Sequence, residues 1–244
     1  TPIKSSAASD VYKRQRQESF PVGKVDMLHI YPMDFEEFMH ACGKEMFCEL
    51  LAKADYSMVD SFAEKYIELL RQYYYVGGMP EAVEVFVTRH DLNEVRTIQQ
   101  NILTAYGADM SKHASKTEAV RISQVFQSLP SQLAKENRKF IYGVAKPGAR
   151  AADFEMAIQW LIDAGIVYRI PRVNKVASPL KFYEDISAFK LFLLDVGLLG
   201  CMSSLPPTII LDNPVALSEY RGMIAEQYVA QQLSSCLLYT SDAA

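Results

Sequence analysis

The stretch AADFEMAIQWLIDAGIVYRIPRV, residues 151–173, decides the fold expected for this chain. Its apolar residues recur at the three-four spacing of one helical face: Phe154, Ala157, Ile158 and Leu161. Gly165 ends this helix, and the apolar run after it predicts a β-strand, which a turn through Asn174 joins to a second strand, SPLKFY. A helix that leads into a β-hairpin is typical of the last helix and the wing of a winged helix-turn-helix.

Two helices are expected before this stretch, and they complete the three-helix order of a winged helix. The first carries an apolar face from Val120 to Leu129 and is expected to break at Pro130. Ser131 can then cap a short second helix, SQLAKEN. After the hairpin, residues 188–194 predict a further strand. Residues 219–233 predict a helix, whose expected buried positions are Met223, Tyr228, Val229 and Leu233.

Residues 34–115 predict helices only. Capping-box patterns begin two of them, Asp34 with Glu37 and Asp91 with Glu94. Between them, Gly77 and Gly78 stop one helix and Pro80 starts the next. In front of this helical region, Val25–Tyr31 (VDMLHIY) predicts a short buried strand.

The composition indicates an ordinary folded protein. The 244 residues carry a net charge of −4, half of them are hydrophobic and 22% are charged, which disfavours disordered, collagen-like and coiled-coil classes. No apolar run reaches the roughly 18 residues that a membrane helix needs, and no secretory signal is visible. The expected location is therefore the cytoplasm, with reduced cysteines and no membrane partner.

The two ends of the chain are expected to be encoded by one piece of DNA. Back-translation of residues 5–15 (SSAASDVYKRQ) gives a DNA whose reverse complement, in another frame, encodes residues 236–244 (CLLYTSDAA). This element looks like a transposase adapter from sequencing-library preparation. We therefore expect residues 1–15 and 236–244 to be adapter-derived tails that make no stable contacts, and the chain between them to be a fragment.

Most motifs of catalysis are absent from the sequence. Gly23-Lys24 resembles the end of the phosphate loop GxxxxGK[ST], but Glu18 replaces its first glycine and Val25 its hydroxyl residue. The four histidines have no metal-ligand spacing, and no HExxH, CxxC or GxSxG occurs. The sequence therefore predicts no catalytic, cofactor-binding or metal site within this chain.

Basic residues are concentrated in the predicted winged helix. Five of them are candidate contacts to DNA phosphates: Lys139, Arg150, Arg169, Arg172 and Lys175. The alternative is a solvated face on a winged helix that binds protein, because Asp153 and Glu155 lie where the predicted recognition helix would meet phosphate. Two further carboxylates, Asp195 and Glu226, lie in apolar surroundings. Asp195 is expected to be a structural cap at a strand-to-helix turn.

Several stretches together resemble a prokaryotic family of AAA-type, archaeal-like predicted ATPases with a C-terminal domain of unknown function. They are SFPVGKVDMLHIYPMDFEEFM, YYYVGGMPEAV, LPSQLAKENRKFIYGVAKPGAR, AIQWLIDAGIVYRI and FKLFLLDVGLL, in the order of the family. In that family the phosphate loop and the magnesium-binding strand precede SFPVGKV. The resemblance thus implies ATP and magnesium as cofactors of the full-length protein, and none for this fragment.

The resemblance also implies a domain order. The fold class is mostly α with α/β elements: the last strand of an ATPase core (16–33), a helical lid (34–115), a winged helix with a following strand (116–200), and the start of a restriction-endonuclease-like domain (201–235). Glu226 matches the carboxylate on the first helix of that last domain. The expected partners are the protein's own ATPase core and DNA. The alternatives are a non-enzymatic winged-helix DNA-binding regulator and a protein-interaction adaptor.

Overall fold

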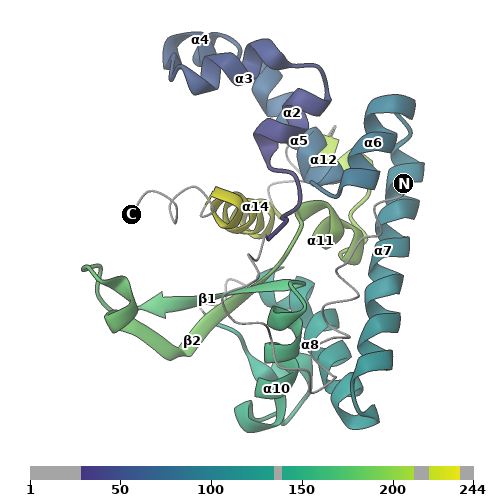
Figure 1. Cartoon of the computed structure of the whole chain (residues 1–244), viewed down its shortest axis with the longest axis vertical. Helices are drawn as coiled ribbons and strands as arrows, with labels where there is room; N and C mark the ends of the chain where they lie inside the picture. The colour runs from purple at the N-terminus through teal and green to yellow at the C-terminus, as the bar shows by residue number, and fades with distance from the viewer. Residues whose placement is uncertain (1–28, 135–138, 212–219, 237–244) are drawn as a thin grey trace, which may run out of the picture. The chain divides into compact units, whose positions relative to one another are not determined.

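The computed structural model describes residues 29–134, 139–211 and 220–236 (Figure 1). The chain divides into two compact units, Thr1–Ile30 and Tyr31–Ala244, of which the first is described only at His29 and Ile30. Residues 29–31 lie in no strand, so the strand predicted over Val25–Tyr31 is wrong at its described end, and its remainder lies outside the described residues. The predicted adapter tails also lie outside them, except Cys236 at the end of the last helix.

The first part of the second unit is helical throughout, as predicted. Its helices are α2 (Phe35–Ala41), α3 (Glu45–Ala52), α4 (Tyr56–Ser61), α5 (Ala63–Val76), α6 (Pro80–Arg89) and α7 (Leu92–His113). The capping box of α2 is confirmed. The Asp34 carboxylate accepts from the Glu37 N–H at 2.8 Å, and the Glu37 carboxylate accepts from the Asp34 N–H at 2.9 Å.

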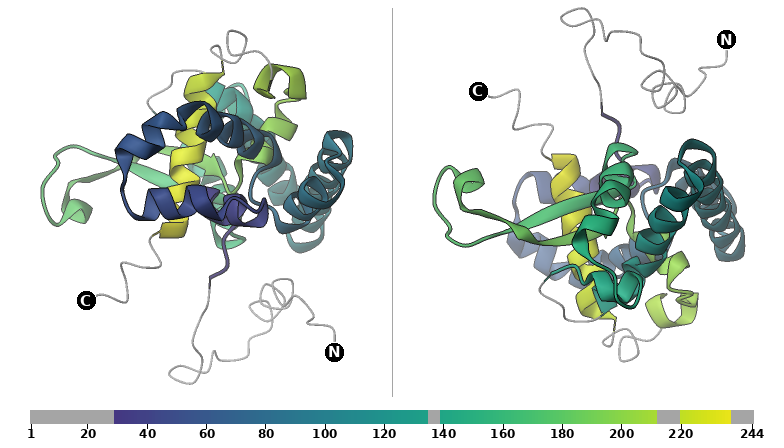
Figure 2. Two further views of the ribbon diagram at one scale, coloured as in Figure 1. Left: turned by 90° about the horizontal axis from the view of Figure 1, so that it is seen from above. Right: turned by 90° about the horizontal axis from the view of Figure 1, so that it is seen from below.

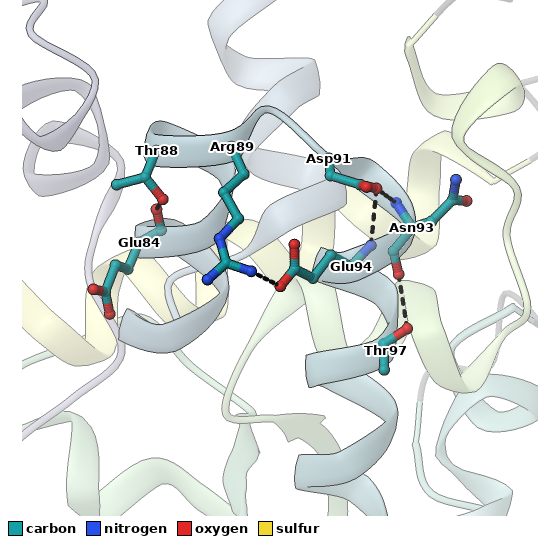
Figure 3. A network of polar contacts seen from close by, with 7 residues as sticks. All are labelled: Glu84, Thr88, Arg89, Asp91, Asn93, Glu94 and Thr97. Atoms are coloured by element: carbon teal, nitrogen blue, oxygen red, sulfur yellow. Dashed lines mark hydrogen bonds and ion pairs between the residues drawn. The ribbon is translucent and has the colours of Figure 1, made fainter.

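The capping box predicted for α7 forms only in part (Figure 3). Asp91 accepts from the N–H groups of Asn93 and Glu94 and so caps the helix. The Glu94 carboxylate instead pairs with the Arg89 guanidinium at the end of α6. A charged donor forms a stronger hydrogen bond with a carboxylate than a backbone N–H does, and this explains the difference from the prediction.

Helix α8 (Lys116–Ala134) continues through Pro130, so the predicted break there, and the cap at Ser131, are wrong. A proline inside a helix costs about 3 kcal/mol. Leu129 and Leu133, on either side of it, are both buried, and burying each such side chain contributes about 1.5–3 kcal/mol. Tertiary packing of this face therefore offsets the local cost of the proline. A short helix, α9 (Tyr142–Ala145), follows in a stretch for which no element was predicted.

Helix α10 (Ala151–Asp163) packs against α8 and leads into the hairpin of β1 (Val167–Val173) and β2 (Glu184–Leu193). The predicted buried face of α10 and the stop at Gly165, with φ of +70°, are confirmed. The antiparallel register runs from Val167 opposite Leu193 to Val173 opposite Glu184, with an irregularity after Pro171. The observed element order is thus three helices followed by a hairpin.

The second strand of the hairpin lies later in the chain than predicted. The segment SPLKFY contains a 3-10 helix, Leu180–Tyr183, and the separate strand expected at residues 188–194 is the end of β2. Residues 188–193 of β2 are largely buried, whereas Leu180 and Phe182 are exposed. The stretch that pairs with β1 is therefore the one that can also bury its side chains.

The helices described after β2 are α11 (Val196–Met202), α12 (Pro207–Leu211) and α14 (Arg221–Cys236). Helix α14 packs against β2, α11 and α8 (Figure 2). Of its predicted buried residues, Met223 is buried and Tyr228 half-buried, whereas Val229 and Leu233 are exposed. The buried side of α14 includes the amides of Gln227 and Gln231, and an apolar pattern could not reveal a polar buried side.

One hydrophobic cluster extends from Phe38 to Ala230 and joins α2 to α14, and a smaller one gathers Met39, Cys48, Tyr66 and Leu69. The described part of the protein is thus mostly helical with a single two-stranded sheet. None of the helices in the described ranges combines the length and the apolar character required to cross a membrane. The predicted division into domains stays a prediction.

Leu161 on α10 is fully buried in the larger cluster. We expect Leu161→Ala to lower the free energy of unfolding by about 2–5 kcal/mol, because the substitution empties a packed leucine site. Met156→Ala is the matched control on the same helix, since its side chain is 70% exposed. Denaturant unfolding measures both variants, and equal effects would contradict this assignment of the buried face.

Candidate functional site

One of the candidate DNA contacts, Arg150, lies at the start of α10, and another, Lys139, lies before α9. Arg150 is the N-cap residue of α10, and its Nε lies 3.3 Å from the Asp153 carboxylate, which also pairs with Arg121 at 3.4 Å. Lys139 is exposed and lies in front of α9, beside a small hollow that Phe140 and Lys190 also line. A phosphate at the start of α10 would therefore meet the negative charge of Asp153 along with Arg150.

Arg169 on β1 is held by three interactions. Its guanidinium lies 3.9 Å from the centre of the Phe189 ring, donates to the carbonyl of Ile186 at 3.2 Å, and pairs with Glu155 at 3.7 Å. A cation over an aromatic face is attracted by the ring quadrupole. Arg169 is thus part of the contact between α10 and the hairpin.

The two remaining candidates lie further along the hairpin. Arg172 pairs with the Asp185 carboxylate across the strands at 2.5 Å. The Lys175 ammonium lies 5.6 Å from the centre of the Tyr183 ring, and Lys175 is exposed. The structure therefore places the five predicted residues on α10, the hairpin and the loop before α9, and three of them are engaged with acidic residues.

Glu226, the predicted nuclease-like carboxylate, forms an ion pair with Lys190 of β2 at 2.7 Å. No group of three or more histidine, cysteine, aspartate or glutamate side chains in the described residues could hold a metal ion. In the described residues, Glu226 therefore joins α14 to the hairpin.

The pKa of Asp185 provides a test of the hydrogen bonds within the hairpin. Hydrogen bonds from the Ser187 hydroxyl and from Arg172 lower the pKa of Asp185 below its ordinary value of 3.8. These hydrogen bonds to the ionised carboxylate therefore stabilise the folded protein above pH 3.8, and this stabilisation is lost as the pH falls through the pKa that Asp185 has in the folded state. By carboxyl-carbon NMR, we expect Ser187→Ala and Arg172→Ala each to raise this pKa, because each removes a hydrogen bond to the carboxylate. No change in either variant would contradict the hydrogen bonding described here.

Asp195 lies at the centre of a buried polar network, and its predicted role as a cap is confirmed. It is the N-cap of α11 and accepts from the Leu198 N–H at 2.9 Å. Its other oxygen accepts from the Gly78 N–H at 2.6 Å and from the Gln231 side-chain amide at 3.2 Å. One carboxylate thus joins the turn after α5, the start of α11 and helix α14.

The Tyr73 hydroxyl extends this network to the start of the second unit. It donates to the Met33 carbonyl at 2.6 Å and accepts from the amides of Gln231 and Gln232 at 2.9 and 3.1 Å. Gln232 in turn accepts from the Phe35 N–H at 2.9 Å. Burial raises the pKa of Asp195 above its ordinary value, and the hydrogen bonds that the carboxylate accepts act in the opposite direction. Burial also raises the pKa of Tyr73. We call Tyr73, Gly78, Asp195, Gln231 and Gln232 the Asp195 network.

Glycines allow the backbones around Asp195 to approach closely. Gly77 has φ of +73° and ψ of −166°, a conformation that is essentially confined to glycine, and a Cβ there would lie 2.2 Å from an Asp195 oxygen. A Cβ on Gly78 would lie 2.0 Å from the Met33 carbonyl oxygen, and one on Gly197 would lie 2.5 Å from that of Val76. The stretches YYYVGGMPEAV and FKLFLLDVGLL therefore pack directly against each other, backbone to backbone.

Sequence reasoning missed the glutamines of this region. Gln99 donates to the carbonyls of Tyr75 and Val76, and Gln227 bonds both backbone groups of Leu193. Gln227 and Gln231 are four residues apart, the spacing of one helical face, and this was the only available signal. Every buried side-chain nitrogen and oxygen in the described residues has a hydrogen-bond partner, so the network is complete.

A family model described as "Domain of unknown function (DUF8612)" matches residues 67–208. No curated protein matches the chain, and neither does any solved structure. The matched residues begin in α5 and end in α12, so they contain the bond from Gly78 to Asp195 and the whole hairpin. Because the match covers more than half of the 244 residues, the chain belongs to this family of domains of unknown function.

Proposed function

We propose that the chain is the C-terminal part of an AAA-type ATPase, and that its helical, winged-helix and C-terminal elements move together in response to nucleotide. The proposal comes from the resemblance of five stretches of sequence, in family order, to such ATPases. The observation in the structure that best supports it is the Asp195 network, which ties α5, α11 and α14 to one carboxylate.

Coupling through this network has a physical basis. Tyr73, Gly78, Asp195 and Gln231 are buried and Gln232 is half-buried, and glycine backbones pack closely around the Asp195 carboxylate. A displacement of one of these segments therefore disturbs the others. A nucleotide-driven movement of the α2–α7 region would then be passed to α11 and α14. Switches of this kind require a ligand that binds two arrangements differently, and the γ-phosphate of ATP serves that purpose in many ATPases.

ATP and magnesium do not fit the residues of this chain. The phosphate-loop pattern is missing from the sequence, and the described residues hold no cluster of metal-ligating side chains. The proposal therefore assigns nucleotide binding to the ATPase core that the resemblance places before Arg16. The chain contributes the elements that respond.

The test compares this chain with a longer protein that includes the coding sequence upstream of residue 16. We expect the longer protein to hydrolyse Mg-ATP, and a non-hydrolysable analogue to change hydrogen exchange at Gly78, Leu198 and Leu193 together. Calorimetry of the present chain with Mg-ATP should give no saturable heat. Low-micromolar binding by the present chain, or a longer protein without GxxxxGK[ST] and without ATP binding, would overturn the proposal.

The second candidate is a DNA-binding winged helix, which the order of α8, α9, α10 and the hairpin favours. Its weakness is that Arg150, Arg169 and Arg172 are engaged with acidic side chains. Duplex binding at two salt concentrations distinguishes the candidates. Salt-dependent binding that Arg150→Ala weakens about equally for all sequences would support DNA binding, whereas no binding at low salt leaves the hairpin for protein contacts.

A further inference from the structure

The outer part of the hairpin exposes several large apolar side chains. Val176 is 89% exposed, Phe182 82% and Ile186 80%, and Ile170 and Leu180 are also exposed. Apolar groups gathered in this way on one protruding element mark interaction sites more often than random surface does. We call these five residues, with Lys175 and Lys181, the hairpin surface.

The hairpin surface is positively charged, although the chain as a whole is acidic. Residues 167–193 contain five cationic and two acidic residues, a formal charge of +3 against −4 for the whole chain. Arg169, Arg172 and Lys190 pair with acidic residues of the same chain, whereas no ion pair is found for Lys175 or Lys181 within the described ranges. A partner of this surface should therefore offer apolar side chains among acidic ones.

An apolar groove continues this surface at the base of the hairpin. It has a volume of about 540 Å³ and lies between the hairpin and α14, where Ile170, Phe192, Val229 and Leu233 line it. An open apolar groove of this kind can accept the protruding apolar side chains of a protein partner.

The chain itself carries a surface of the required chemistry on α3 and α4. Residues 45–61 contain four acidic residues and one lysine, a formal charge of −3. They also expose Met46, Tyr56 and Met58, and methionine adapts well to irregular grooves. We call Glu45, Met46, Glu49, Tyr56, Met58 and Asp60 the helical surface.

Strand addition is the less suitable mode of association for this hairpin. Pro171 lacks the N–H that an added strand would require along β1. In β2 the N–H of Ser187 is already bonded to the Asp185 carboxylate at 2.9 Å. Edge strands protected in this way resist pairing with another strand, so side-chain contacts remain as the basis of binding.

We propose that the hairpin surface of one copy of this chain binds the helical surface of a second copy. The segments that carry the two surfaces, residues 167–193 and 45–61, have formal charges of +3 and −3, and both surfaces expose large apolar side chains. Because the two surfaces differ, the contact either repeats head to tail, as a heterologous interface, or occurs twice about a twofold axis, as an isologous one. The proposal does not depend on ATP binding.

Sedimentation velocity and light scattering of the whole chain test this proposal. We expect the mass to rise above that of one chain with increasing concentration and to fall towards it at high salt, since charge attraction is screened. Phe182→Ser should weaken association about tenfold or more, as loss of a central aromatic contact does. Met156→Ser, on α10 and also largely exposed at 70%, is the matched control and should leave association unchanged.

Charge reversal gives the decisive result. Lys175→Glu with Lys181→Glu, and separately Glu49→Lys with Asp60→Lys, should each give a monomer, while a mixture of the two double variants should form a complex. Mixing restores opposite charges at both contacts, which misfolded variants could not reproduce. A single-chain mass at every concentration, no complex in the mixture, or flotation with anionic vesicles by a chain that stays monomeric would overturn the proposal.

Discussion

Replacing Asp195 with alanine is expected to lower the free energy of unfolding by about 3–5 kcal/mol, which is a large share of the stability of a typical domain. The substitution leaves the N–H groups of Gly78 and Leu198 without their acceptor in the interior, and it removes one of the two acceptors of the Gln231 amide. Each buried donor that loses its partner costs about 1–3 kcal/mol.

The matched control for this substitution is Asp34→Ala at the N-cap of α2. Its bonds are made within a single helical turn, and loss of such a cap costs about 1 kcal/mol. Denaturant titration of both variants measures the difference. Similar losses from the two variants would show that Asp195 acts only as a local cap and does not hold distant segments together.

Gly77→Ala is expected to be as damaging, with a loss of at least about 4 kcal/mol or no folded protein. The backbone of Gly77 lies in a region that other residues avoid, and the added methyl group would overlap the Asp195 carboxylate. Gly148→Ala separates the two causes, because Gly148 has φ of +75° and open space around its Cβ position. It should cost only about 1–2 kcal/mol, the penalty of the backbone alone.

Thermal and denaturant unfolding of these two glycine variants provide the measurement. If Gly148→Ala lowers the stability as much as Gly77→Ala does, the close approach of Asp195 to the turn after α5 does not contribute to the loss caused by Gly77→Ala. If Gly77→Ala folds with nearly unchanged stability, the turn can move away from Asp195, and coupling through the network is then wrong.

Much of the helical architecture could be predicted from local signals. The three-four spacing in α10, the cap at Asp34 and the stop at Gly77 depend on residues close in sequence, and the structure confirms all three. The helix break predicted at Pro130 was wrong because the free-energy cost of the proline is visible in the local sequence, whereas the burial that offsets it involves helices distant in sequence. Likewise, Leu180 and Phe182 resemble strand residues in sequence but are exposed in the folded protein.

The candidate site could be predicted less well. Basic residue types predicted phosphate contacts, but ion pairs with Asp153, Glu155 and Asp185 depend on how α10 and the hairpin meet. Asp195 could be identified as a cap from the LLDVG pattern. Its bonds to Gly78 and Gln231 join residues 117 and 36 positions apart, and no spacing rule reaches that far.

The side-chain amide of Gln227 also determines how α14 can be aligned. It accepts from the N–H of Leu193 at 2.9 Å and donates to the carbonyl of the same residue at 2.5 Å, as a neighbouring strand would. Since each residue turns a helix by about 100°, a shift of one position would bring Glu226 or Tyr228 to this place, and neither carries both a donor and an acceptor amide. An insertion or deletion between Gln227 and Gln231 would therefore move one of these two amides away from its backbone partners, so their spacing is constrained even where the outer face of α14 is free to vary.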